Sequence, residues 1–222
     1  MLISRRGLLA RAAISAAGLA AGMAYMRETL AQGAVKPGVY GVKGEVLLNG
    51  QPMKRGMLVK DGDTVESKRG EAVIIVERDA YLIRADTKME FRPPEEKAPA
   101  GVLRVLAGKV LSAFTPNRGK EIRTHTATIG IRGTGTYMEV APDVTYICTC
   151  YGEAQLDALA DSKQSELVRT TYHDSPRYVY AATSAKGPLI EIAPVINHQD
   201  AELIYLEELV GRKTPFTGPP RY

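Results

Sequence analysis

The chain has 222 residues, of which 24% are charged and 45% hydrophobic, proportions typical of a globular protein with an apolar core. Its net charge is +4 and its pI is near 9.0. Most of this positive charge lies in residues 1–31, which hold four arginines and one glutamate. The other residues hold 25 basic and 24 acidic side chains. Because the rest is nearly neutral and no basic patch has interleaved aromatics, the composition argues against a nucleic-acid partner.

The N-terminus predicts an export signal. Ser4-Arg5-Arg6-Gly7-Leu8-Leu9 opens a mildly apolar run of about 17 residues, rich in Ala and Gly, which is marginal for spanning a bilayer. The run resembles a twin-arginine signal, which the translocase reads as an address; a Sec signal or an uncleaved anchor is the alternative. We expect cleavage of residues 1–31 near residue 24 or 31, with the twin-arginine translocase as partner during export. The protein would then lie in the periplasm of a Gram-negative bacterium and contact the membrane only transiently or through an uncleaved leader.

After a linker, short β-branched and aromatic segments alternate with Gly, Pro, Asn and Asp. Asn49-Gly50 predicts a two-residue hairpin turn of type I′, and residues 92–99 are too rich in Pro and Glu for a strand, which predicts an exposed loop. Many short strands at near-regular spacing predict an all-β fold, either a sandwich or a jelly roll. The segments expected to be extended are residues 39–48, 57–59, 72–76, 81–84, 102–106, 109–114, 121–131, 137–140, 145–151, 154–156, 167–172, 178–182 and 189–192.

The most informative segment, residues 127–140, leads a β-branched strand into a Gly133-Thr134-Gly135 corner and out into a second strand. Glycines allow the positive φ or close backbone approach that a kinked strand needs. Arg132 stands at the bend. Its five donors suit a carboxylate-bearing ligand such as a metal chelate, or alternatively the backbone carbonyls of a corner that cannot pair in a ladder.

This corner, with other segments in the same order, resembles the FecR-type domain, the periplasmic module of ferric-citrate-type signalling regulators. The resemblance covers residues 42–157 and implies an all-β domain without catalytic residues. Those regulators carry a sigma-factor-binding segment and a transmembrane helix before the domain, which this sequence lacks, so we do not expect it to be the transmembrane relay. The other matching segments are Gly56-Met-Leu-Val-Lys-Asp-Gly-Asp-Thr-Val, Gly70-Glu-Ala-Val-Ile-Ile-Val, Leu103-Arg-Val-Leu-Ala-Gly-Lys-Val-Leu and residues 146–152.

The two cysteines, Cys148 and Cys150, lie on a predicted strand, where residues two apart share a face with Cα atoms roughly 6.5–7 Å apart. That spacing is at the upper edge of disulfide reach. Three interpretations stay open: buried apolar thiols, a distorted disulfide, or a transition-metal or haem site that His173 or His198 completes. We expect the third histidine, His125, to be structural.

One C-terminal stretch, residues 200–210, has the period of an amphipathic helix, with Leu203 and Leu206 on one side and Gly211 at its end. We therefore expect a FecR-like β domain over residues 39–157, a β-hairpin extension and a helix docked on the sheet over residues 158–215, and a loose tail over residues 216–222.

The sequence contains no phosphate loop, no Gly-x-Ser-x-Gly motif and no His-x-x-x-His pair. We therefore expect a protein that is not an enzyme. The leading prediction is an exported sensing, binding or scaffold module that contacts another envelope protein. The alternative is a small periplasmic protein that binds a metal or haem through Cys148 and Cys150.

Overall fold

The computed structural model describes residues 36–94 and 101–217, and in this part of the chain it has 14 strands in one mixed sheet and one helix. The predicted all-β fold with a C-terminal helix is confirmed. The predicted export signal, with Arg5 and Arg6, lies outside the described residues. Within them, no helix has the length and apolar character that a membrane span requires.

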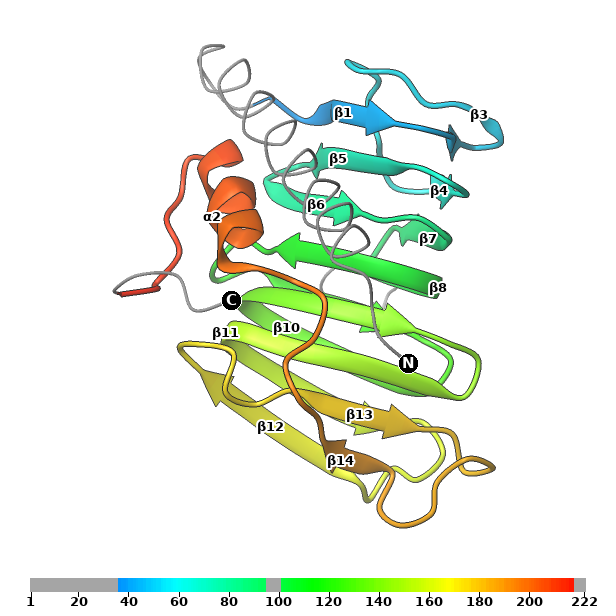
Figure 1. The fold of residues 1–222 in the computed structure, drawn as a ribbon, viewed down its shortest axis with the longest axis vertical. Helices are drawn as coiled ribbons and strands as arrows, with labels where there is room; N and C mark the ends of the chain where they lie inside the picture. Colours follow the sequence, from blue (N-terminus) through cyan, green and yellow to red (C-terminus); the bar gives the residue numbers. More distant parts are fainter. Residues whose placement is uncertain (1–35, 95–100, 218–222) are drawn as a thin grey trace, which may run out of the picture. The chain divides into compact units, whose positions relative to one another are not determined.

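The strand pairings arrange the sheet as two layers that share three long strands (Figure 1). The shared strands are β8 (Val102–Ala113), β10 (Ala127–Val140) and β11 (Val144–Ala158). The first layer adds β2 (Val46–Leu48), β3 (Gln51–Pro52), β4 (Thr64–Ser67), β7 (Thr87–Arg92), β9 (Gly119–Arg123) and β12 (Ser165–Thr170). The second layer adds β1 (Gly38–Lys43), β5 (Glu71–Val76), β6 (Asp79–Ile83), β13 (Arg177–Tyr180) and β14 (Ile190–Ile192).

Each long strand passes from one layer to the other at a glycine with positive φ: Gly108 at 95°, Gly133 at 61° and Gly152 at 94°. A Cβ on Gly152 would lie 2.6 Å from the carbonyl oxygen of Gly133, so two of these bends touch each other. The register of β10 against β11 shifts between Arg132 and Gly135, which places the predicted glycine corner at a bulge. The corner is thus confirmed, although the strand continues through it.

The bends explain how both halves of a long strand face one core. Side chains of a regular strand alternate between faces, so a core contributed by odd-numbered residues must change to even-numbered ones where a bulge intervenes. In β10 the core residues are Ile129 and Ile131 before the corner and Met138 and Val140 after it. In β11 the order is reversed, with Ile147 before Gly152 and Ala154, Leu156 and Ala158 after it.

Several predicted strands differ from the observed ones. Residues 57–59 do not form a strand, and the predicted strand 39–48 is divided between β1 and β2. The segments 102–106 and 109–114 form the single strand β8, and 145–151 and 154–156 form β11, because their glycines bend the strand without ending it. The predicted strand 121–131 is divided between β9 and β10. There the Thr124 hydroxyl accepts hydrogen bonds from the backbone N–H groups of Thr126 and Ala127, so local side-chain bonding replaces the ladder.

The hairpin between β2 and β3 has φ values of 52° at Asn49 and 78° at Gly50. Positive φ at both central residues defines a type I′ turn, so this prediction is confirmed. Asp63 supports the turn from the side, since its carboxylate accepts hydrogen bonds from the Asn49 side chain and from the backbone N–H of Lys60.

The helix α2 (Asp200–Leu209) contacts β6 and β8 of the second layer, on the face opposite the core (Figure 1). Leu203 and Leu206 are fully buried there. A bidentate ion pair at 2.7 and 2.8 Å joins Arg84 to Glu202 near the start of the helix, and Arg212 pairs with Glu207 near its end. The predicted docking of the helix on the sheet is therefore confirmed, and it covers one end of the outer face of the second layer.

Candidate metal centre

Four side chains predicted as metal ligands, Cys148, Cys150, His173 and His198, meet on the outer face of the second layer. One ligand atom from each lies within 4.8 Å of all the others, and all four side chains are buried. The ligands come from β11, from the turn between β12 and β13, and from the segment that enters α2. The fold thus brings together residues that are up to 50 positions apart in the sequence.

The alternation of side chains along β11 decides which face the cysteines occupy. Ile147 faces the core between the layers, so Cys148 and Cys150 point to the opposite face, where each side chain is inaccessible to solvent. Both thiols are free. The prediction that the thiols share a face is confirmed.

His173 is held in a strained backbone conformation. Its φ is +38°, which is uncommon for a residue other than glycine and costs on the order of 1–3 kcal/mol. The backbone N–H of His173 donates to the carbonyl of Cys150 at 3.0 Å, which fixes the turn against β11. Nδ1 lies 3.6 Å from Sγ of Cys148, and Nε2 lies 3.0 Å from Oδ1 of Asp200.

His198 is fixed by two contacts of its ring. The ring stacks on Tyr137 with centroids 4.6 Å apart and planes inclined by 21°. Nδ1 lies 2.6 Å from the carbonyl oxygen of Ile196, and Nε2 lies 3.4 Å from Sγ of Cys150. The ring is therefore oriented with Nε2 toward the thiols.

The contacts of the two rings limit where the protons lie. Nδ1 of His198 lies 2.6 Å from the carbonyl oxygen of Ile196 and carries a proton, and Nε2 of His173 lies 3.0 Å from Oδ1 of Asp200. The remaining two nitrogens are 2.9 Å apart, so in the absence of a metal one proton between them satisfies both. With the outer nitrogens protonated instead, the inner two present lone pairs to each other, an arrangement that a metal ion among the four donors would stabilise.

The distances suit a small tetrahedral ion. Zinc bonds of 2.0–2.1 Å to nitrogen and 2.3 Å to sulfur correspond to ligand–ligand separations of about 3.3–3.8 Å. The two nitrogen–sulfur distances of 3.4 and 3.6 Å fall in this range, the nitrogen–nitrogen distance is shorter, and the four ligand atoms are separated by up to 4.8 Å. Binding of an ion would therefore move the two nitrogens apart and draw the most widely separated donors together.

The two thiols are electrostatically different. Hydrogen bonding with Cys150, followed by hydrogen bonding with the two imidazoles, lowers the pKa of Cys148, whereas burial raises the pKa of Cys150. The two thiols thus differ in how readily they lose a proton. The thiolate is the form that binds metals, and a divalent cation would favour deprotonation of both.

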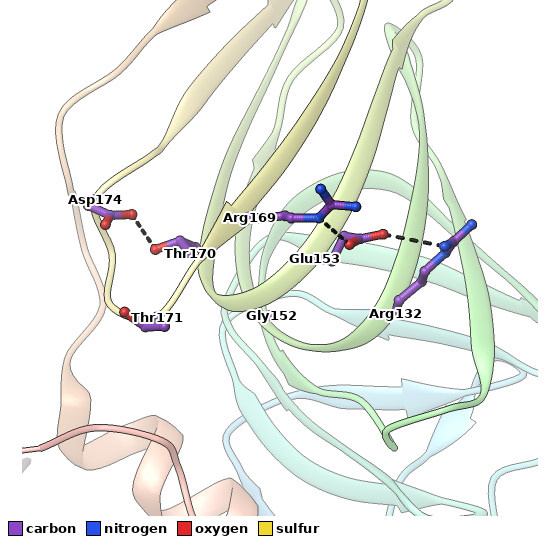
Figure 2. A pocket seen from close by; sticks show the side chains of 7 residues that line it. All are labelled: Arg132, Gly152, Glu153, Arg169, Thr170, Thr171 and Asp174. Atoms are coloured by element: carbon purple, nitrogen blue, oxygen red, sulfur yellow. Dashed lines mark hydrogen bonds and ion pairs between the residues drawn. The ribbon is translucent and has the colours of Figure 1, made fainter.

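Arg132 lies away from this cluster, on the rim of a pocket of about 480 Å³ (Figure 2). Its side chain is 79% exposed and lies 3.4 Å from the carboxylate of Glu153, which Arg169 contacts at 2.6 Å. The Arg169 hydrogen bond lowers the pKa of Glu153. The structure thus places Arg132 in an ion pair beside the corner, and its role toward a ligand stays a prediction.

Three residues around the cluster were not predicted: Asp200, Tyr172 and Phe216. Asp200 begins α2 and is 1% exposed, and the Phe216 ring lies 5.2 Å from the His173 ring. His125 lies outside the cluster, and its Nε2 is 2.8 Å from the carbonyl oxygen of Leu106. This backbone contact agrees with the structural role predicted for His125.

No family model matches this chain, and no significant match occurs among curated proteins. Among solved structures, the chain is similar to two structures from Parabacteroides distasonis, each provisionally described as an anti-sigma factor. The first has 10% identity and a TM-score of 0.47, the second 11% and 0.46. The matches span 58% and 57% of this chain, and 59% and 57% of the other two. The FecR-type resemblance therefore stays a prediction.

Proposed function

We propose that this protein binds one divalent transition-metal ion, zinc in type, through Cys148, Cys150, His173 and His198. The observation that carries the proposal is the convergence of four buried donor atoms, with the outer nitrogens of the two histidine rings 3.0 and 2.6 Å from the oxygen atoms of Asp200 and Ile196. Two sulfur and two nitrogen ligands are typical of tetrahedral zinc sites. In this site two thiolates would neutralise the charge of a divalent ion, which favours its burial.

A single ion fits this arrangement better than haem. A haem iron takes its axial ligands from opposite sides of a flat macrocycle. Here the four donors surround one point and the histidine nitrogens are 2.9 Å apart, closer together than two axial ligands can stand. The geometry thus favours the metal alternative over the haem alternative.

The same geometry favours a structural ion and a protein that is not an enzyme. A catalytic zinc keeps a position open for water, whereas a structural zinc has four protein ligands. All four ligands here are buried, and the two-layered sheet that carries them would serve as a rigid binding or scaffold module. An assay in which the purified protein turned over hydrolase or redox substrates, with loss on substitution of one ligand, would contradict this part of the proposal.

Elemental analysis of the full-length protein, purified from its native host without chelator, tests the metal proposal. We expect about one equivalent of zinc per chain, less than a tenth of that in Cys148→Ser, and an unchanged content in His125→Ala. His125 is the matched control because it is the remaining histidine and lies outside the cluster. Metal well below one equivalent, with no difference between Cys148→Ser and the unaltered protein, would overturn the proposal.

We also propose export by the twin-arginine route to the periplasm, where the module would contact another envelope protein. This route carries folded proteins, so the ion would be inserted in the cytoplasm, where thiols stay reduced. Replacing Arg5 and Arg6 by Lys should leave zinc-containing precursor in the cytoplasm. Periplasmic accumulation of that variant at the normal level would contradict export by this route.

A further inference from the structure

Asp200 occupies an unusual place for a carboxylate. It is the first residue of α2 and is 1% exposed, although ionised side chains are costly to bury unless they are paired and hydrogen-bonded. Its Oδ1 lies 3.0 Å from Nε2 of His173, and its Oδ2 accepts a hydrogen bond of 2.5 Å from the hydroxyl of Tyr172. Both carboxylate oxygens are thus directed at the turn that carries a metal ligand.

A helix alone does not require this arrangement. An acidic residue in the first turn is favourable because of the helix dipole, but an exposed one serves equally well. Glu202 supplies that charge in the same turn, where its side chain is partly exposed and pairs with Arg84. The burial of Asp200 against His173 therefore has a separate cause.

We infer that Asp200 is the positioning residue of the proposed metal centre, an inference that rests on the proposed function. It holds the proton of His173 on Nε2, so that Nδ1 faces Cys148 with its lone pair free for the metal. Carboxylates in this relation to a ligating histidine fix the ring and raise its basicity. Tyr172 in turn fixes the carboxylate.

The position of Asp200 also couples the metal to the helix. His198 precedes α2 and Asp200 begins it, so both the direct ligand and the positioning residue move with the first turn of the helix. Cys148 and Cys150 belong to β11, which is part of the sheet. Metal binding therefore fastens the first turn of α2 to the sheet, and opening of that turn must break the site.

The test compares Asp200→Asn and Asp200→Ala with Glu202→Gln in the full-length protein. Zinc affinity is measured by competition with a chromogenic chelator, and amide hydrogen exchange of residues 196–203 is followed with and without zinc. Removal of a partner of this kind costs 10–100-fold in metal affinity, so we expect at least a tenfold loss in both Asp200 variants. We expect less than a threefold change in Glu202→Gln, which loosens the same turn without touching His173.

Two readouts separate positioning from a merely structural role. Cobalt(II) at saturation should give the same tetrahedral, thiolate-bound spectrum in Asp200→Asn as in the unaltered protein, since all four ligands remain. Zinc should slow exchange over residues 196–203 in the unaltered protein and do so much less in Asp200→Ala. If Asp200→Ala fails to fold, Asp200→Asn decides the affinity question.

The outcomes distinguish this inference from the proposed function. Equal zinc affinity in Asp200→Asn and the unaltered protein, or zinc-independent exchange over residues 196–203, would overturn the role of Asp200 while leaving the metal site in place. Absence of zinc binding by the unaltered protein would remove the proposed function itself and with it the inference.

Discussion

Nδ1 of His173 lies 2.9 Å from Nε2 of His198, although the two residues are 25 positions apart and come from different segments. Each ring has its other nitrogen directed at an acceptor, Asp200 in one case and the carbonyl of Ile196 in the other. Two lone pairs at this distance need a proton or a metal ion between them.

Metal removal should lower the thermal stability of the protein. A ligand that binds only the folded state at 1,000 times its Kd contributes about 4 kcal/mol. For a domain of this size, 1 kcal/mol corresponds to roughly 2–4 °C in Tm, so excess zinc should raise Tm by about 10 °C over the metal-free protein. Differential scanning calorimetry of both forms measures the shift. Equal Tm values, with zinc shown to be bound, would mean that the unfolded chain binds zinc as tightly as the fold does.

Acidification should release the metal. Coordinated sulfur and nitrogen must be deprotonated, so protons compete with the metal for them. Burial raises the pKa of Cys150, so metal binding displaces its proton, and affinity should fall by about tenfold per pH unit, or at least about 100-fold between pH 7.5 and 5.5. Chelator competition across this range measures it, with His125→Ala as the control expected to follow the same curve. A pH-independent affinity would exclude ligation by the Cys150 thiolate.

Phe216 should slow metal exchange. Its ring packs edge-on against Tyr172 and Tyr151, with centroids 5.0 and 5.5 Å apart, and thus covers the His173 side of the cluster. Phe216→Ala opens this side, so we expect zinc transfer to a fast chelator to accelerate by about tenfold, the effect of lowering a barrier by about 1.4 kcal/mol. Stopped-flow absorbance measures the rate. Lys213→Ala, an exposed residue of the same segment, is the control, and equal acceleration in both variants would assign the effect to the segment rather than to the ring.

Gly152→Ala should destabilise the fold strongly. Gly152 has φ +94°, and an added Cβ would lie 2.6 Å from the carbonyl oxygen of Gly133 where the long strands change layer. A backbone clash added to an unfavourable φ should cost about 2–4 kcal/mol, compared with less than about 0.5 kcal/mol for Gly187→Ala, which has room for the methyl group. Urea unfolding measures both. A similar, small loss in the two variants would show that the bend is not constrained as described.

Arg132→Ala should change neither stability nor zinc content. Its side chain is 79% exposed, and its contact with Glu153 at 3.4 Å is a surface ion pair, a kind that is worth about 0–1 kcal/mol. The same urea titration and metal analysis measure the outcome. A loss above about 2 kcal/mol would show that Arg132 supports the corner through contacts other than this ion pair.

The sequence predicted the features that depend on local chemistry. Asn49-Gly50 is typical of a type I′ turn, and the spacing of apolar residues over 200–210 is typical of a helix. Residues two apart on a strand share a face, which predicted that Cys148 and Cys150 lie side by side. The same alternation could not show which face the thiols would take. In β11 the residues that face the core are odd-numbered before Gly152 and even-numbered after it, and the sequence does not mark this change.

Other features depend on tertiary structure and left no local signal. Glycine was interpreted as the end of a strand, whereas Gly108 and Gly152 carry the strand from one layer to the other. β7 (Thr87–Arg92) is an exception: it was missed although buried Thr87, Met89 and Phe91 alternate with Lys88 and Glu90, the pattern of a half-buried strand. Asp200 looked like an ordinary acidic residue at a helix start. Its burial against His173 arises only when the turn after β12 meets the segment before α2.

X-ray absorption at the zinc edge of the zinc-loaded, full-length protein tests the central claim most directly. The account predicts two sulfur neighbours at about 2.3 Å and two nitrogen neighbours at about 2.0–2.1 Å, the distances of a tetrahedral Cys₂His₂ site. One sulfur neighbour should be lost in Cys148→Ser. A shell of oxygen and nitrogen atoms alone, with no sulfur contribution, would contradict the account.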